Sequence, residues 1–380
     1  MTDVDSDLKI AFVSDYISIH QKALCDALYD ELKGNFLFLA TSKISEKRLK
    51  MGWHDYTDSV GYAIRDYNCT REELFDKLSQ CDAIIIGSSH IAGLHDKFHD
   101  KIVLDYRERP FKKGIRSLLN PKLLYSLILT YLEQRSDRCY LLSAGRLAYV
   151  DYRKFHCYRN RAVKWGYFIN PITEEFQPRD NGKLQILWVG RLIDWKHCEM
   201  FVRAADHLKG NGVDADFRIV GDGPEKTHVR ALIDQYHLQD AVVFCGNKDN
   251  NEVKEIMLGA DIFISTSDSQ EGWGVVVSEA MSAGCCVLAS DHIGSASYLI
   301  NHGKNGILFR DGNQDDLNAK LLHIAGDAAT RVEYAKNAVM TMNTVWHPVN
   351  AAKSLVRLIG NLLGRENMGK LEEGPCSMAD

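Results

Sequence analysis

Two glutamates, Glu271 and Glu279, mark the stretch of this sequence whose residue types and spacing point most clearly to chemistry. They enclose two glycines, a tryptophan and a run of three valines. An apolar run of strand length precedes them over residues 260–267, and a helical segment ending at Gly284 leads into a second strand-like run over 285–290. This order of strand, glycine-containing loop, helix and strand predicts a βαβ unit, whose loop opens onto a ligand crevice.

The loop between these predicted elements has the features of a phosphate-binding site. Gly272 and Gly274 allow the backbone to approach an anion closely, and the amides of Gly274, Val275 and Val276 begin the predicted helix. Unpaired amides and the positive end of a helix dipole together attract phosphate. Glu279 lies about one and a half turns into that helix and can lean back toward the same opening. Carboxylates repel phosphate, so the two glutamates are expected to bind another part of the ligand. Hydroxyl groups, which sugars supply, are suitable partners for them.

This stretch resembles the Glu-x7-Glu signature of the family-four retaining glycosyltransferases, which have the GT-B fold. The resemblance continues through most of residues 183–345. Arg191 and Lys196 match the phosphate-binding arginine and lysine of the family. Residues 217–224 match its IVGxGP segment and residues 243–246 match its FxG strand, so four motifs occur in the expected order.

The resemblance implies a role for each matching residue. Glu279 would hold the ribose of the donor, Glu271 the transferred sugar, and Arg191 with Lys196 the diphosphate. The remaining donor-binding residues implied by the match are Gly190, Gly246, Asn247, Gly272, Trp273, Gly274, Val275 and Val276. The family transfers sugars with retention at the anomeric carbon and without a metal, so no cofactor or metal is expected. Because no amino-acid nucleophile is evident, front-face attack is the working mechanism.

Length and composition favour a globular protein of two domains. The chain has 380 residues, of which 45% are hydrophobic and 26% charged. No apolar run approaches the roughly 20 residues of a membrane span, and the acidic amino terminus does not resemble a signal peptide. The 10 cysteines form neither a CxxC motif nor a Cys/His cluster. We therefore expect reduced thiols and a cytoplasmic protein. Location at the inner face of the cell membrane is the alternative.

Strand-like runs alternate with helical segments through the amino-terminal half as well. They are expected at residues 8–14, 35–41, 82–88, 101–106, 138–144 and 162–168. This alternation predicts a parallel sheet with helices on both faces. The fold class is therefore α/β, a GT-B arrangement of two Rossmann-like domains that face each other across a cleft, with a carboxyl-terminal helix crossing back to the first domain.

The domain boundaries are expected where the composition changes. The segment 171–183 is polar and contains two prolines between two strand-rich blocks. The expected parts are an acceptor-side Rossmann-like domain over 1–170, a linker over 171–183, a nucleotide-sugar-binding Rossmann-like domain over 184–345, a crossover helix over 346–363 and a disordered tail over 364–380.

Candidate acceptor-side residues follow the strands of the first domain. They are Asp15, His20, Glu108 and Arg109, together with His90, to which we assign the sugar-side histidine of the family. Each has an alternative interpretation, because a histidine can simply cap a helix and residues 107–109 can form a solvated charge cluster. The sequence also departs from the family here, since residues 15–20 lack its glycine pair and Tyr106 stands where many members have a histidine.

Residues 101–170 carry a strong positive charge. They contain 15 Lys/Arg and 5 Asp/Glu, a net charge of +10, within a chain whose net charge is −5. Residues 110–129 mix basic and apolar side chains, a pattern typical of segments that lie on anionic membranes and suited to a lipid-linked acceptor. The alternative is a buried helix with a basic solvent-exposed edge. No nucleic-acid-binding motif accompanies this charge, so no nucleic acid partner is expected.

Two other motifs resemble signatures of different sites, but neither is in the required context. Lys226 stands where the third glycine of a dinucleotide fingerprint is required, which argues against a nicotinamide oxidoreductase. Asp214 and Asp216 form a D-x-D motif, but at the entry of a strand, which is the wrong end for a site in a parallel sheet.

The sequence thus predicts transfer of a sugar from a UDP- or GDP-linked donor to a glycan or lipid-linked saccharide in bacterial surface-polysaccharide synthesis. A nucleotide-sugar epimerase and a non-catalytic nucleotide-sugar-binding protein are the alternatives.

Overall fold

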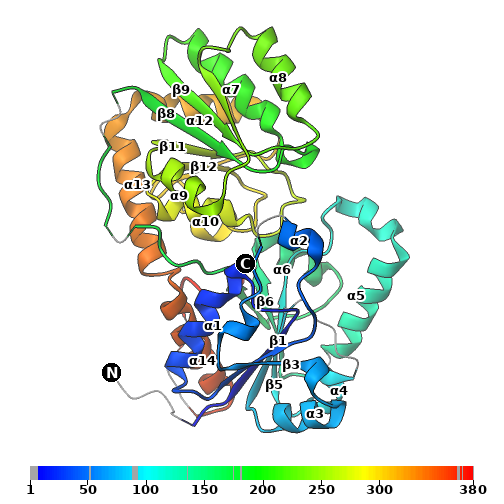
Figure 1. Ribbon diagram of the computed structural model, residues 1–380. Coiled ribbons are helices and arrows are strands. Elements are labelled where there is room, and N and C mark those ends of the chain that lie inside the picture. Colours follow the sequence, from blue (N-terminus) through cyan, green and yellow to red (C-terminus); the bar gives the residue numbers. More distant parts are fainter. Residues whose placement is uncertain are drawn as a thin grey trace. The chain divides into compact units, whose positions relative to one another are not determined.

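The computed structural model describes residues 7–50, 53–87, 93–134, 136–173, 175–179, 182–365, 369 and 371–379. The chain divides into two compact units. Unit 1 comprises Met1–Asn170 and Val345–Asp380, and unit 2 comprises Pro171–Thr344. Each unit is built on its own parallel sheet, as Figure 1 shows.

The sheet of unit 1 has seven strands in the order β3-β2-β1-β4-β5-β6-β7, and all its strand pairs are parallel. The strands are β1 (Ile10–Ser14), β2 (Phe36–Ala40), β3 (Ala63–Arg65), β4 (Ala83–Ile86), β5 (Ile102–Arg107), β6 (Cys139–Ala144) and β7 (Ala162–Trp165). Six of them coincide with strands predicted from the sequence. The short edge strand β3 was not predicted, because its three residues do not form an apolar run.

The helices of unit 1 connect these strands and include one helix from the end of the chain. They are α1 (Ile19–Glu31), α2 (Glu46–Lys50), α3 (Arg71–Ser79), α4 (Leu94–Lys97), α5 (Pro121–Glu133), α6 (Arg146–Lys154) and α14 (Pro348–Leu362). α14 begins with Pro348 in its first turn, where no backbone N–H is needed, and it packs against α1. The predicted return of the carboxyl-terminal helix to the first domain is therefore confirmed.

The expectation of a disordered tail over residues 364–380 is wrong for residues 371–379. Met378 forms an antiparallel bridge with Val163 of β7. The amide of Lys164 donates to the carbonyl of Ser377 at 2.8 Å, and Lys164 accepts from the amide of Cys376 at 2.8 Å. β7 is an edge strand with unpaired backbone groups, and the tail supplies partners for them.

The sheet of unit 2 has six parallel strands in the order β10-β9-β8-β11-β12-β13. The strands are β8 (Leu184–Val189), β9 (Ala215–Val220), β10 (Val242–Gly246), β11 (Ile262–Ser265), β12 (Cys286–Ser290) and β13 (Ile307–Phe309). The helices are α7 (Cys198–Gly210), α8 (Lys226–Gln235), α9 (Asn250–Leu258), α10 (Val275–Ser282), α11 (Ala296–Leu299), α12 (Gln314–Gly326) and α13 (Ala328–Asn343).

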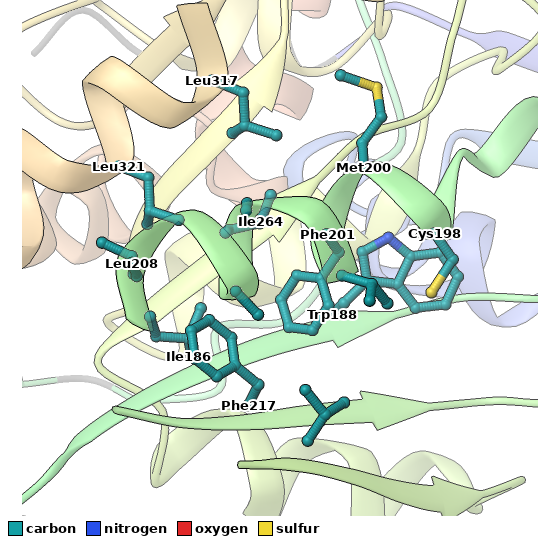
Figure 2. Close-up of a cluster of buried hydrophobic side chains, with 14 of the residues drawn as sticks. Ile186, Trp188, Cys198, Met200, Phe201, Leu208, Phe217, Ile264, Leu317 and Leu321 are labelled. Atoms are coloured by element: carbon teal, nitrogen blue, oxygen red, sulfur yellow. The ribbon is translucent and has the colours of Figure 1, made fainter. Parts of the chain in front are cut away.

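The core of unit 2 holds α7 firmly against the sheet. Figure 2 shows Phe201 of this helix beside Phe217 of β9, with ring centroids 5.7 Å apart in an edge-to-face arrangement. Leu317 and Leu321 of α12 belong to the same buried cluster. Complete burial of each such side chain contributes about 1.5–3 kcal/mol. Because α7 is fixed in this way, the loop that precedes it has a fixed end point.

The segment expected to link the domains is attached to unit 2. The amide of Ile172 donates to the Oγ of Ser282 at 2.7 Å. The guanidinium of Arg179 donates to the carbonyl oxygens of Leu258, Ala283 and Gly284, which lie at the ends of α9 and α10. One arginine thus satisfies carbonyl groups that the ends of two helices leave without helical partners.

Candidate functional site

The central strand β8 marks the point in unit 2 where the chain changes direction across the sheet. β9 follows on one side of β8 and β11 lies on its other side. Ligands of open α/β sheets bind outside the carboxyl ends of the strands at such a switch point. The loops over residues 190–197 and 266–274 leave the carboxyl ends of β8 and β11, and they carry most of the predicted donor-binding residues.

The structure brings the predicted lysine and glutamate together between these two loops. The Nζ of Lys196 forms an ion pair with a carboxylate oxygen of Glu271, and both side chains are mostly buried. The backbone carbonyl of Lys196 accepts from the Oγ1 of Thr266 at 2.7 Å. That threonine accepts in turn from the indole N–H of Trp188 at 3.0 Å. Residues on β8 and directly after β11 therefore fix the position of the lysine.

Arg191 lies in the same loop as Lys196, two residues after the end of β8, and it is exposed. The preceding residue, Gly190, donates its amide to the carbonyl of Val220 at 3.0 Å. A Cβ at Gly221 would overlap the carbonyl oxygen of Gly190, and one at Gly223 would overlap that of Leu192. The glycines after β9 are thus required by close backbone packing between two loops, which explains a glycine-rich turn that is not a dinucleotide fingerprint.

Glycines also shape the loop between Glu271 and α10. Gly274 precedes the helix with φ +76°, and a Cβ there would lie 2.8 Å from Cγ2 of Ile293. The carbonyl of Gly272 accepts from the amide of Gly294 at 3.1 Å. The Oγ of Ser295 donates to the carbonyl of Gly274 at 2.9 Å. The loop after β12 therefore supports the loop before α10, whose first residues are Val275 and Val276.

The side chain of Trp273 is part of the core. Its ring is 1% exposed, and its indole N–H points to the Oγ of Ser278 at 3.3 Å. The carbonyl of Trp273 accepts from the amide of Ser295 at 2.7 Å. The tryptophan therefore supports the predicted phosphate loop from within the fold and does not offer its ring to a ligand.

Glu279 occupies the second turn of α10 and is partly buried. Burial raises its pKa to about 7, against a smaller opposing effect of the Lys254 charge. Among the described residues, none makes a hydrogen bond to its carboxylate. This carboxyl group thus changes its charge near neutral pH and has acceptor capacity available for a ligand.

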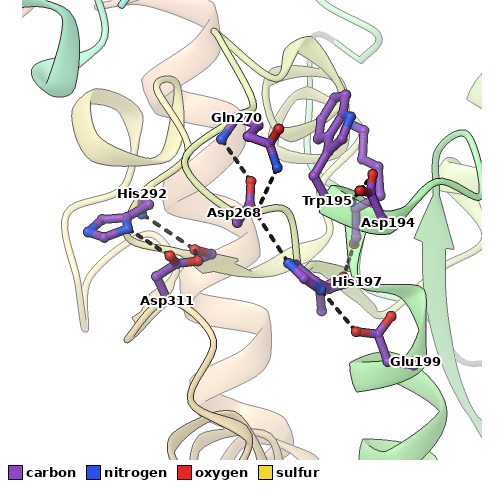
Figure 3. A network of polar contacts seen from close by, with 11 residues as sticks. Asp194, Trp195, His197, Glu199, Asp268, Gln270, His292 and Asp311 are labelled. Carbon is purple, nitrogen blue, oxygen red and sulfur yellow. Dashed lines mark hydrogen bonds and ion pairs between the residues drawn. The ribbon is translucent and has the colours of Figure 1, made fainter. Parts of the chain in front are cut away.

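A histidine that the sequence did not suggest lies beside the Lys196–Glu271 pair. In Figure 3, His197 lies between Glu199 and Asp268, with its Nδ1 2.9 Å from a Glu199 oxygen and its Nε2 3.4 Å from an Asp268 oxygen. The hydrogen bond with Glu199, and then that with Asp268, raises the pKa of His197 to about 9. The ring is therefore a cation at neutral pH, held between two carboxylates.

Asp268 joins the two loops through its backbone and side chain. Its amide donates to the carbonyl of Trp195 at 3.0 Å, and its carboxylate accepts from the amide of Gln270 at 2.7 Å (Figure 3). The sequence contained a signal that sequence reasoning missed: His197 directly follows the predicted lysine, and Asp268 lies three residues before Glu271.

A second histidine–aspartate pair follows β12 and β13. The Nδ1 of His292 lies 2.8 Å from one carboxylate oxygen of Asp311 (Figure 3), and the other oxygen accepts from the Oγ of Ser290 at 3.0 Å. Burial alone would raise the pKa of Asp311, but these hydrogen bonds and the charge of His292 lower it. Polar groups therefore follow four neighbouring strands, β8, β11, β12 and β13.

The remaining donor-side candidates lie on the other side of β8. The carbonyl of Gly246, at the end of β10, accepts from the amide of Gly221 at 2.8 Å. Asn247 follows it and is exposed. Asp214 and Asp216 of the D-x-D motif both pair with Lys183, at 2.9 and 2.7 Å. The D-x-D motif thus forms a surface ion pair at the amino end of β9.

The acceptor-side candidates of unit 1 are linked by one tyrosine. The ring of His20 stacks on that of Tyr167, with centroids 5.8 Å apart, and contacts the Trp53 ring edge-on at 5.3 Å. The hydroxyl of Tyr167 donates to Glu108 at 2.7 Å. Burial lowers the pKa of His20 to about 4, so this ring is neutral at physiological pH. Asp15 lies nearby in sequence, partly buried after β1.

Arg109 is engaged elsewhere. Its Nε donates to the carboxylate of Asp151 at 3.1 Å, and the same carboxylate accepts from the amide of Phe111 at 3.3 Å. This pair fixes the chain after β5. His90, the remaining catalytic candidate, lies outside the described residues.

A buried polar cluster lies inside unit 1. His95, Asp105 and Cys139 bring potential metal ligands within 4.8 Å of one another. Asp105 also accepts from the hydroxyl of Tyr158 at 2.5 Å and lies 3.5 Å from the guanidinium of Arg107. Burial alone would raise the pKa of Asp105, but the charge of Arg107 and the hydrogen bond with His95 lower it. The carboxylate is therefore already neutralised by the protein's own cations, so this cluster is best described as a buried ion-pair network.

The sequence of unit 2 matches a known family. Residues 171–340 match the model of "Glycosyl transferases group 1". AmsK of Erwinia amylovora, an amylovoran biosynthesis glycosyltransferase, is 30% identical over 184 residues, which cover 47% of this chain and 45% of AmsK. WcaL of Salmonella typhimurium, named for colanic acid biosynthesis, is 34% identical over 143 residues, 36% of this chain and 35% of WcaL. The matches span less than half the length of these relatives.

Solved structures resemble the whole chain in fold. The Anabaena protein Alr3699/HepE in complex with UDP has a TM-score of 0.68 at 14% identity, covering 94% of this chain and 100% of that one. A sucrose-phosphate synthase of Thermosynechococcus elongatus has a TM-score of 0.64 at 16% identity, with coverage of 94% and 100%. The chain therefore has two Rossmann-like units in the GT-B fold, and unit 2 matches the model of the group 1 glycosyltransferases. The resemblance predicted from the Glu-x7-Glu stretch is confirmed.

Within the described part of the chain, no helix combines the length and apolarity that crossing a membrane requires.

Proposed function

We propose that this protein is a retaining glycosyltransferase that moves a sugar from a UDP- or GDP-linked donor to a hydroxyl group of a glycan or lipid-linked saccharide. The observation that carries the proposal is the Lys196–Glu271 pair, buried between the loops after β8 and β11 and next to the start of α10. This arrangement suits a sugar diphosphate. The cation and the amino terminus of the helix attract the diphosphate, the carboxylate can accept hydrogen bonds from sugar hydroxyls, and all three lie at the switch point of a parallel sheet.

The leaving group explains the cations in unit 2. A nucleoside diphosphate gains negative charge as the bond to the sugar breaks, and preorganised donors stabilise that charge. Lys196 supplies a point charge, and the exposed Arg191 supplies a planar fork that can reach the same diphosphate. His197 is protonated at neutral pH, but Glu199 and Asp268 balance its charge, so we assign it to holding together the loops after β8 and β11.

The carboxylates are assigned to hydroxyl groups of the donor. In the free protein Glu271 neutralises Lys196, and a bound diphosphate would take over that lysine and release the glutamate for the transferred sugar. Glu279, whose carboxylate has acceptor capacity available, is assigned to the ribose. We assign no nucleophile among the residues, so the acceptor would attack from the face the leaving group departs from and give its proton to the leaving phosphate.

The biological role is proposed from the named relatives and from the thiols. Two relatives of unit 2 are named for the biosynthesis of amylovoran and of colanic acid, which supports a role in bacterial cell-surface polysaccharide synthesis. The described cysteines are free thiols, which suits a reducing compartment. We therefore place the enzyme in the cytoplasm, acting on a glycan or lipid-linked acceptor at the inner face of the membrane, without a metal or cofactor.

The test begins with the donor. The whole chain is screened by thermal shift against UDP- and GDP-linked sugars, because a ligand that prefers the folded state raises the melting temperature. With the donor so identified, Lys196→Ala should lower turnover by about 10²–10³-fold, the usual effect of removing one oxyanion-stabilising group. Lys226→Ala is the matched control, since Lys226 forms an ion pair with Asp222 at 2.6 Å and both side chains are partly exposed.

Three outcomes would overturn the proposal. If Lys196→Ala turned over donor at the wild-type rate, Lys196 would not have the role in catalysis on which the proposal depends. Conversion of the donor to an isomerised sugar without acceptor would identify an epimerase. Stabilisation by a nucleotide sugar without any hydrolysis or transfer would identify a non-catalytic binding protein.

A further inference from the structure

The helix α5 of unit 1 is apolar on two opposite faces (cyan in Figure 1). On its inner face, Leu127 is buried in the core and Leu123 packs against it. Its outer face carries Leu124, Tyr125, Ile128, Tyr131 and Leu132, all of them exposed. Surface helices of globular proteins normally carry charged or polar residues on the outer face, so the exposed apolar stripe requires another explanation.

The exposure of this stripe is large, and it is concentrated in one place. Tyr125 is 64% exposed and Ile128 is 51% exposed. In the turn that precedes α5, Leu119 is 84% exposed, the highest value for any large apolar residue among those described. An exposed apolar patch of this kind marks an interaction site.

The segment that carries the stripe has positive charge and no negative charge. Residues 112–132 contain four Lys/Arg and no Asp/Glu. The next acidic residue, Glu133, is turned inward, 3.8 Å from His95 and 3.8 Å from Arg107. Lys112 pairs with Glu108 at 2.7 Å, which leaves Lys113, Arg116 and Lys122 as the exposed cations beside the stripe.

A hollow of about 570 Å³ lies at the amino-terminal end of α5. Its lining includes the cations Lys112, Lys113 and Arg116 and the apolar residues Leu119 and Leu123. Cations and apolar side chains thus line the same hollow. This combination matches the chemistry of a phospholipid, whose phosphate lies next to its acyl chains.

We propose that the outer face of α5 and the turn before it, residues 112–132, form a docking surface for an anionic phospholipid bilayer. The apolar stripe enters the boundary between headgroups and acyl chains, and the three exposed cations bind lipid phosphates. The helix has 13 residues and lies on the bilayer without crossing it. α5 is buried on one face, as the buried-helix alternative expects, and its exposed apolar face supports the membrane alternative. A lipid surface is favoured over a protein partner because residues 112–132 carry four positive charges and no negative charge.

The test is co-sedimentation of the whole chain with vesicles of mixed phosphatidylglycerol and phosphatidylcholine, compared with phosphatidylcholine alone. The protein should bind the anionic vesicles preferentially. The double variant Tyr125→Ser/Ile128→Ser should weaken that binding by about tenfold, because two half-buried apolar contacts are lost. The variant Lys113→Gln/Arg116→Gln/Lys122→Gln should weaken it by about a hundredfold, at about fivefold for each cation.

The matched control is Val243→Ser/Met340→Ser, which removes two similarly exposed apolar side chains from unit 2 and should leave vesicle binding unchanged. The proposal is overturned if the wild-type chain ignores anionic vesicles or if the α5 variants bind them as well as wild type does. It is also overturned if Tyr125→Ser/Ile128→Ser only converts an oligomer to a monomer, since a second copy of the chain would then cover α5.

The docking surface and the proposed sugar transfer can fail independently. The α5 variants should hydrolyse a nucleotide-sugar donor at the wild-type rate, because none of the substituted residues lies in unit 2. Conversely, Lys196→Ala should lose turnover and keep vesicle binding.

Discussion

At the carboxyl ends of their strands, the two units hold their loops in different ways. In unit 2, backbone lies against backbone, as where Gly294 donates to the carbonyl of Gly272 and where Gly221 passes over the carbonyl of Gly190. In unit 1, the segments after β1, β5 and β7 meet through side chains, as where Tyr167 stacks on His20 and donates to Glu108.

This difference determines how readily each site can be recognised and altered. A loop held by close backbone contact tolerates no Cβ at certain positions, so its glycines have fixed spacing and form a motif. A loop held by aromatic and charged side chains has no such restriction. Its residue types can vary while the backbone keeps its path, which suits an acceptor site that must differ between relatives.

The interiors of the two units differ as well. The core of unit 2 beneath α7 is a cluster of apolar side chains. That of unit 1 includes the buried carboxylate of Asp105 with His95, Arg107 and Tyr158 around it. Breaking a buried ion pair leaves an uncompensated charge, whereas an apolar core carries no such risk.

The largest effect is expected for Asp105→Asn. Removing this carboxylate takes from Arg107 and His95 the closer of their two carboxylate partners, since Glu133 lies 3.8 Å from each, and should lower the free energy of unfolding of unit 1 by about 3–5 kcal/mol. Thermal unfolding and hydrogen exchange of the β5 amides would measure it. Asp216→Asn, which removes a carboxylate from a surface pair with Lys183, is the control and should change little. Equal stability of the two variants would contradict the importance of the network.

The next largest effect is expected for Gly294→Ala. A Cβ there would overlap the carbonyl of Gly272 and displace the loop before α10. A displacement of about 1 Å at a catalytic site can lower turnover by about a hundredfold, and kcat for donor hydrolysis would show it. Gly326→Ala is the control, because a Cβ at Gly326 meets nothing within 4 Å. Full activity of Gly294→Ala would show that this loop adapts and that backbone contact does not define the site.

A smaller effect is expected from pH through Glu279. With its pKa raised to about 7 by burial, this group is protonated below that pH and accepts hydrogen bonds from ribose hydroxyls less well. Donor affinity should therefore rise with pH up to about 7, by at most tenfold per pH unit, as isothermal titration would show. Glu279→Gln should bind the donor with little pH dependence over the same range.

The same group makes stability depend on pH in the opposite direction. In the unfolded chain this carboxyl group loses its proton near 4.5, while in the folded chain it keeps the proton up to about 7. Between these values the folded state binds more protons, so stability should fall as pH rises. The melting temperature of Glu279→Gln should lack this part of the decline. If wild type and Glu279→Gln showed the same pH dependence of both affinity and stability, the role given to Glu279 would be wrong.

The smallest effect is expected for Tyr167→Phe in unit 1. The change removes one hydrogen bond to Glu108, worth about 1 kcal/mol or roughly fivefold, and keeps the stacking on His20. We expect KM for the acceptor to rise by this factor while the affinity for the donor stays unchanged. An equal loss of donor affinity would show that the two units do not divide the substrates in this way.

The sequence by itself determined the alternation of strands and helices and the family resemblance of unit 2. These features depend on neighbours in the chain: apolar runs of strand length, a glycine after a strand, and two glutamates on one loop and helix. The backbone geometry of a βαβ unit is similar wherever it occurs, so such short-range patterns predict it.

Only the tertiary structure decided which side chains meet. His197 and Asp268 each lie close to a predicted site residue in the sequence, but their contact could not be predicted, because they belong to loops after different strands that become neighbours only in the sheet. The same holds for His20 with Tyr167, for Asp105 with Tyr158, and for the tail that bridges to β7. Contacts between distant segments depend on the order of strands in the folded sheet, and a linear pattern of residues does not encode that order.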